Sequence, residues 1–124
     1  MELTPQQKFE DKNYQFRNQL EELQDAQRDN ANDRRYLETL QEQFYKVQQQ
    51  EQKMYQESLN EADPEERSFF EELQAEGMHL SRRALQELEE EQEFLEQDHK
   101  GLLEKEDSVR SAHRNFLKSE GKEN

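Results

Sequence analysis

The segment Asn60-Glu61-Ala62-Asp63-Pro64-Glu65-Glu66, at the midpoint of the chain, carries the signals that begin an α-helix. Asp63 can accept a hydrogen bond from a free backbone N–H of the first helical turn. Pro64 then occupies the first helical position, where its missing N–H costs nothing. The two glutamates that follow place negative charge beside the positive end of the new helix. The segment therefore predicts that one helix ends and another begins here.

The start of the chain repeats these signals. Thr4 is placed to cap a helix, Pro5 follows it, and Gln7 stands three residues after the cap, as in a capping box. The chain has only two prolines, Pro5 and Pro64, and each stands at such a start. We therefore predict helices over about residues 5–60 and 64–118, with a turn at 61–63.

The predicted fold is an all-α, antiparallel, coiled-coil-like two-helix hairpin. Residues 1–124 are expected to form one domain, because 124 residues are enough for one small domain. The helix is expected to end at Gly121, with residues 119–124 as a frayed tail.

Composition supports this fold and limits the core. Only 29% of the residues are hydrophobic and 39% are charged, with a net charge of −14. A thick globular core is excluded by so few apolar residues, whereas a hairpin needs only one apolar stripe on each helix. The chain has no Ile or Trp and only two Val, so strands are disfavoured.

The same composition bounds partners and location. An acidic surface argues against nucleic acid and against anionic membranes, so we expect protein partners. The absence of Cys excludes disulfides and thiolate metal sites. No signal-peptide pattern and no apolar run of about 20 residues is present, which predicts cytoplasmic synthesis without membrane insertion. Export together with a partner, by a route that needs no signal peptide, stays open.

Apolar residues recur at helical spacings in both halves, and antiparallel pairing matches them. The pairing places Phe9 opposite Phe116, Leu37 opposite Leu88, and Val47 opposite Met78. The full set predicted for the hairpin interface is Phe9, Phe16, Leu23, Leu37, Leu40, Val47, Met78, Leu85, Leu88, Leu95, Leu102, Val109 and Phe116.

Residues 24–35 are polar and predict a weak or bent place in the first helix, because Asn and Asp compete with helical hydrogen bonds. The pairing places Asn30 opposite Leu95 and Arg34 opposite Glu91. Such a polar layer predicts a register lock, which can cost stability yet fix the alignment of the helices.

Catalytic and metal-binding patterns are weak. Glu76 with His79 and Glu96 with His99 share the Glu-x-x-His spacing of ferritin-like iron ligands, but they lie about 30 Å apart on one helix. A helical hairpin offers no obvious pocket that would separate two carboxylate pKa values. We therefore expect no enzyme activity, no metal and no cofactor.

Some apolar residues fall outside the predicted interface and suggest a second contact surface. These candidate partner-binding residues are Tyr14, Tyr36, Phe69, Phe94, Leu103 and Leu117. Ordinary exposure or a wider interface stripe would explain them equally well. The acidic run from Glu87 to Asp98 also has two interpretations: it is either a docking face for a basic partner or a solvated helix face.

The segment Ser81-Arg82-Arg83-Ala84-Leu85-Gln86-Glu87-Leu88-Glu89-Glu90-Glu91-Gln92-Glu93-Phe94-Leu95, with Leu102-Leu103-Glu104-Lys105-Glu106 and Arg110, resembles a known family. These are small helical proteins encoded beside LXG toxins of the Gram-positive type VII secretion system, similar to WXG100 proteins in size and hairpin form. The resemblance implies a paired targeting factor or chaperone that binds the helical N-terminal domain of the toxin.

Two features depart from the WXG100 pattern. Ala62-Asp63-Pro64 stands where Trp-x-Gly would be, and no Tyr is followed four residues later by Asp or Glu. A second small helical subunit carrying the export signal would fit this difference. Two other functions are open: a stalk-type coiled coil of a flagellar or type III export apparatus, and a generic scaffold that self-associates as a homodimer.

Overall fold

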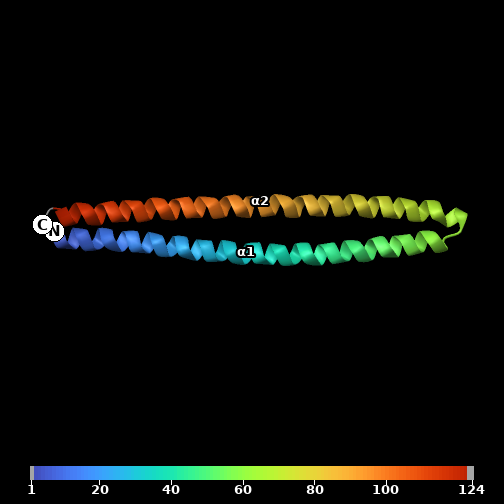
Figure 1. Cartoon of the computed structure of the whole chain (residues 1–124), viewed down its shortest axis with the longest axis horizontal. Coiled ribbons are helices and arrows are strands. Elements are labelled where there is room, and N and C mark those ends of the chain that lie inside the picture. Colours follow the sequence, from blue (N-terminus) through green and yellow to red (C-terminus); the bar gives the residue numbers. More distant parts are fainter. Residues whose placement is uncertain (1, 123–124) are drawn as a thin grey trace. The chain divides into compact units, whose positions relative to one another are not determined.

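The computed structural model describes residues 2–122 and consists of two helices. Helix α1 spans Pro5–Glu61 and helix α2 spans Pro64–Lys122. They run antiparallel and are joined at Ala62 and Asp63 (Figure 1). The predicted all-α hairpin is therefore confirmed, with a turn that begins one residue later than expected.

The predicted end of the second helix is wrong. Helix α2 continues through Gly121 to Lys122, and neither helix contains a glycine with positive φ. The reason is that glycine lowers helix stability but does not itself end a helix unless it adopts the left-handed conformation. Residues 123–124 of the predicted tail lie outside the described part of the chain.

The two predicted caps are both found at helix starts. The Gln7 amide N–H donates to Thr4 Oγ1 over 3.2 Å, and the Thr4 N–H donates to Gln7 Oε1 over 3.0 Å, which is a complete capping box. At Asp63 the backbone carbonyl accepts the amides of Glu66 at 2.9 Å and Arg67 at 3.0 Å, which are the first hydrogen bonds of α2. A helix therefore starts where each signal predicts, and a side-chain cap by Asp63 stays a prediction.

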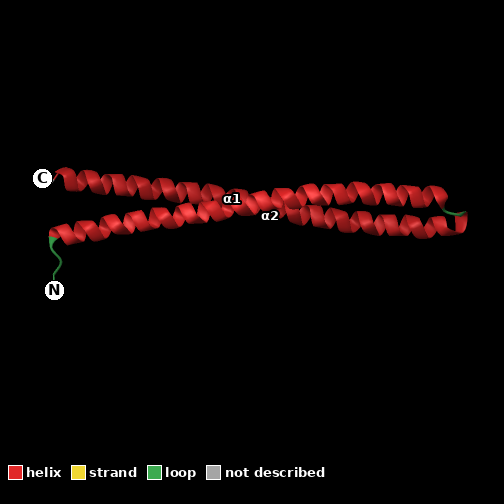
Figure 2. Ribbon diagram, turned by 90° about the horizontal axis from the view of Figure 1, so that it is seen from below, coloured by secondary structure: helices red, strands yellow, loops and turns green. Residues whose placement is uncertain are grey.

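The polar residues 24–35 do not interrupt α1. Both elements are continuous helices (Figure 2). The chain divides into two compact units, and the division falls in this region: Met1–Asn32 with Leu95–Asn124 form the terminal unit, and Asp33–Phe94 form the turn unit.

In the terminal unit, aromatic rings join the helices. Phe9 stacks on Phe116 with ring centroids 5.2 Å apart, as the predicted pairing requires. Phe16 stacks on His113 at 5.0 Å, one turn beyond the residue directly opposite it in the predicted pairing. Side chains lean toward the N-terminus of their own helix, so in an antiparallel pair they reach one turn further along the partner.

Asn30 forms the predicted polar layer in the terminal unit. Its side chain is 2% exposed, and Nδ2 donates to the Leu95 carbonyl and to Asp98 Oδ2, each over 3.0 Å. Leu95 itself is 7% exposed. The buried amide is therefore satisfied only when this pair of residues is aligned, which is the property of a register lock.

The interface positions of α1 repeat every seven residues along the whole helix. One series is buried or half-buried throughout and consists of Phe9, Phe16, Leu23, Asn30, Leu37, Phe44, Glu51 and Ser58. A second series, also half-buried, consists of Asn13, Leu20, Gln27, Arg34, Gln41, Gln48 and Tyr55. This strict spacing is that of a coiled coil.

Three residues predicted for the interface lie outside it. Val47 is 49% exposed, Met78 41% and Leu85 39%. The half-buried neighbours Gln48, Gly77 and Ala84 take their places. An uninterrupted helix cannot rotate locally, so the face set by Leu37 and Phe44 carries Glu51 and Ser58 inward and leaves Val47 beside the interface.

The other predicted interface residues are placed as expected. Leu37 and Leu95 are buried. The remaining half-buried members of the predicted set are Phe9, Phe16, Leu23, Leu40, Leu88, Leu102, Val109 and Phe116.

Candidate interaction surface

The interior of the turn unit is made largely of small and polar residues. On α1 its half-buried positions include Gln48, Glu51 and Ser58. On α2 they include Gln74, Gly77, Ser81 and Ala84. Such residues bring little apolar area out of water, so this part of the interface gains less stabilisation than one lined by Leu.

The large apolar residues of the turn unit lie mostly outside that interior. Of 14 exposed large hydrophobic residues among those described, 10 belong to the turn unit. They are Tyr36, Tyr45, Val47, Met54, Phe69, Leu73, Met78, Leu80, Leu85 and Phe94. Single exposed apolar side chains are ordinary, but a concentration in one half of a small protein marks an interaction surface.

A second apolar stripe on α1 carries part of this surface. Leu40, Val47 and Met54 follow one another at seven-residue spacing, so they lie on one side of the helix about 10 Å apart. Leu40 is half-buried, whereas Val47 and Met54 are 49% and 57% exposed. The stripe runs directly beside the interface positions.

A groove of ≈ 530 Å³ lies between the two helices at this stripe. Helix α1 lines it with Leu37, Leu40, Gln43, Phe44 and Val47. Helix α2 lines it with Ala84, Glu87, Leu88 and Glu91. The floor is apolar, and the only charged residues of the lining are two glutamates of α2. We call it the Val47 groove.

The unit that holds the Val47 groove is also the more acidic one. Residues 33–94 contain 17 acidic and 7 basic residues, a net charge of −10 within the −14 of the whole chain. Glu87 and Glu91 belong to the run from Glu87 to Asp98, which has seven acids and no base. The groove therefore combines an apolar floor with a strongly negative wall.

The six residues predicted to bind a partner are all exposed and are divided between the two units. Tyr36, Phe69 and Phe94 belong to the turn unit and are 59% to 67% exposed. The other three, Tyr14, Leu103 and Leu117, belong to the terminal unit. Each unit thus presents its own apolar side chains.

Sequence reasoning missed the Val47 groove because it assigned Val47 to the hairpin interface. The signal that separates Val47 from that interface is its phase along α1. Phe9, Phe16, Leu23, Leu37 and Phe44 keep one seven-residue series, whereas Leu40, Val47 and Met54 keep another. Two parallel apolar stripes on one helix indicate two packing partners.

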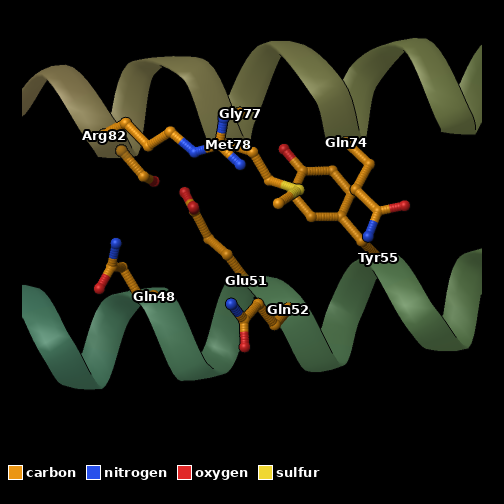
Figure 3. Close-up of a pocket in the computed structure, with 9 residues that line it drawn as sticks. Gln48, Glu51, Gln52, Tyr55, Gln74, Gly77, Met78 and Arg82 are labelled. Carbon is orange, nitrogen blue, oxygen red and sulfur yellow. The ribbon is translucent and has the colours of Figure 1, made fainter.

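A smaller cavity of ≈ 150 Å³ also lies within the turn unit. Tyr55 of α1 packs beside Gly77 of α2, and Glu51 points between the helices (Figure 3). A Cβ on residue 77 would lie 2.7 Å from Tyr55 Oη, so the glycine makes room for the ring. The lining is rich in glutamine amides and is suited to water rather than to an apolar ligand.

The polar side chains of the terminal unit form short networks. Gln27 Nε2 donates to Glu106 Oε2, and Arg110 donates to Glu106 Oε1 through Nε at 3.0 Å and Nη2 at 2.9 Å. These hydrogen bonds, the one from Gln27 first, lower the pKa of the Glu106 carboxyl below its ordinary value. His113 Nε2 lies 2.7 Å from Asn13 Oδ1. The contacts of Gln27 with Glu106 and of Asn13 with His113 join the two helices, whereas Arg110 and Glu106 both belong to α2.

The described residues hold no group of three or more His, Asp or Glu side chains that could bind a metal ion. Within residues 2–122, neither helix is long and apolar enough to span a membrane. His99 is half-buried, and its Nδ1 is a buried atom without a hydrogen-bond partner. A buried polar atom of this kind costs stability.

Comparisons with protein-family models, with curated proteins and with solved structures find no match to this chain. The class is therefore defined by the fold alone, as an all-α helical hairpin. Its distinguishing site is the apolar, acid-walled surface of the turn unit.

Proposed function

We propose that this protein is a non-enzymatic interaction module, an accessory targeting factor or chaperone that binds the helical N-terminal domain of an LXG toxin of type VII secretion. The observation that carries the proposal is the concentration of exposed apolar side chains in the turn unit, 10 of 14. A hairpin with small or polar residues at several interior positions of its turn unit and many apolar residues on the outside of that unit is suited to packing against further helices.

The resemblance over Ser81–Leu95 supports the same function, because that segment forms the α2 wall of the exposed surface. In this proposal the toxin helices complete a bundle that the hairpin alone leaves open. Nucleic acids and anionic membranes are disfavoured as partners, because the net charge of −14 repels both.

The test is co-expression of the tagged protein with the helical N-terminal domain of an LXG toxin from the same host. The two chains are expected to co-purify as a complex, and the protein should melt at a higher temperature in the complex than alone. Two chains that elute separately, each with an unchanged melting temperature, would overturn the proposal.

A further inference from the structure

The floor of the Val47 groove matches the side-chain spacing of a helix. Leu40 and Val47 are seven residues apart, about 10 Å along α1. A helix lying along the groove presents apolar residues at the same interval, at positions i and i+7, with others at i+3 or i+4 between them. The groove lies between two helices, which is where a third helix packs ridges into grooves.

The wall of the groove indicates the charge of that helix. Glu87 and Glu91 are one helical turn apart on α2, and the lining contains no basic residue to neutralise them. Lys or Arg residues beside the apolar stripe of a bound helix would therefore meet carboxylates at the rim. Their (CH₂) stems would at the same time cover apolar surface.

A second copy of this chain fits the groove less well. Each copy carries a net charge of −10 in its turn unit, so pairing two turn units brings like charges together. The apolar stripe of α1 is followed on the same helix by acidic residues such as Glu57 and Glu61. Like-charge juxtaposition at an interface opposes association.

We infer that the Val47 groove is a docking site for a basic amphipathic helix, with an apolar stripe on the Leu40–Val47 floor and Lys or Arg beside Glu87 and Glu91. The inference deepens the proposed function and rests on it for the helical form of the partner. It adds the surface that binds and the charge of the partner helix.

The experiment uses the full chain and a fluorescein-labelled synthetic peptide of about 21 residues, three heptads long. The peptide has leucines at helical spacing and lysines on both flanks. One control peptide has glutamates in place of the lysines, and another has the same composition in scrambled order. Binding is measured by fluorescence anisotropy at about 0.15 M salt, where long-range attraction is screened.

The amphipathic lysine peptide is expected to bind, and both control peptides are expected to bind at least about tenfold more weakly. Val47→Glu places a charge on the groove floor and should weaken binding by about tenfold or more. Leu3→Glu is the matched control, because Leu3 is 48% exposed in the terminal unit while Val47 is 49% exposed in the turn unit. It should leave the affinity unchanged.

A second variant keeps the test independent of folding. The double substitution Glu87→Gln and Glu91→Gln alters only side chains exposed on α2 and leaves their size unchanged. It should weaken binding of the lysine peptide several-fold and reduce the dependence of the affinity on salt concentration. Far-UV circular dichroism of each variant confirms that helicity is retained.

Four outcomes would overturn the inference. The scrambled peptide binding equally would show attraction by net charge alone, and the glutamate peptide binding equally would show no preference for a basic helix. An unchanged affinity of Val47→Glu would place the site elsewhere. A dimer of the free chain that Val47→Glu dissociates, seen by sedimentation equilibrium, would show that a second copy occupies the groove.

These results separate the inference from the proposed function. If the toxin domain co-purifies equally with wild type and Val47→Glu, the proposed function is supported and the Val47 groove is refuted as the binding site. If the lysine peptide binds the Val47 groove but the toxin domain does not co-purify, the docking site is supported and the toxin is refuted as the partner.

Discussion

Asn30→Ala should destabilise the hairpin by removing the buried polar layer of the terminal unit. The side chain is 2% exposed and donates two hydrogen bonds of 3.0 Å, one to the Leu95 carbonyl and one to the carboxylate of Asp98. A neutral hydrogen bond contributes about 1 kcal/mol and one to a charged group about 1.5–3 kcal/mol. Asp98 is exposed and regains water on loss of the amide, which keeps the cost near the lower end.

Alanine also returns about 0.5 kcal/mol through its higher helix propensity. The expected net loss is therefore about 2 kcal/mol, or roughly 8 °C in Tm for a chain of this length. The assay is urea unfolding followed by circular dichroism at about 222 nm, the helix band. The matched control is Asn32→Ala, because Asn32 is exposed on the same helix two positions away and should gain only its propensity.

Equal stability of Asn30→Ala and Asn32→Ala would refute this reasoning, since propensity is the same in both. Asn30→Leu adds a further test of the register lock, because it restores apolar packing but removes the directional hydrogen bonds. It should recover stability while broadening amide resonances of the terminal unit, as alternative alignments become accessible.

The remaining predictions concern stability within single elements. Gly101→Ala should stabilise the protein by about 0.5–1 kcal/mol in thermal unfolding, because an added Cβ meets nothing within 4 Å. Gly77→Ala should stabilise it less, because Tyr55 must move to make room for the Cβ. Equal stabilisation by the two substitutions would contradict the crowding at residue 77. His99→Leu should raise Tm because it removes the unpartnered Nδ1, and a lowered Tm would show that this nitrogen has a role in folding. The Glu106 carboxyl has a lowered folded-state pKa, so its contribution is present above pH 4.5, the ordinary value, and is lost as the pH falls through the folded-state pKa. The stability difference between wild type and Glu106→Gln should therefore shrink on acidification, and a difference that does not change with pH would exclude this cause.

The sequence was sufficient to predict the hairpin because its start signals are local. A capping box at Thr4 and Gln7, and Asp63 before Pro64, depend only on neighbouring residues, and the structure places a helix start at each. The pairing of Phe9 with Phe116 and of Asn30 with Leu95 follows from the turn position and is also found. These are the features that a short connection between antiparallel helices determines.

The candidate surface was harder to predict because it depends on the rotation of a long helix. Val47 and Gln48 are neighbours, and local pattern favours burying Val47. The rotation is set instead by Leu37 and Phe44, whose seven-residue series continues inward through Glu51 and Ser58. The continuity of the helix therefore outweighs the local preference for burying Val47, and Val47 lies on the exposed surface.

The end of α2 was missed for a different reason. Glycine can adopt the left-handed conformation that ends many helices, but a glycine can also remain in the helical conformation. The two earlier glycines, Gly77 and Gly101, also lie within α2. The helix therefore continues through all three glycines.

The most direct test of the account is a parallel affinity capture from the native host with three tagged proteins: wild type, Val47→Glu, and the control Leu3→Glu. Captured proteins are identified by mass spectrometry. The account predicts that wild type and Leu3→Glu retain a helical N-terminal toxin domain and that Val47→Glu loses it. Capture of an export ATPase, recovery of the bait alone, or equal recovery of the toxin domain with Val47→Glu would contradict it.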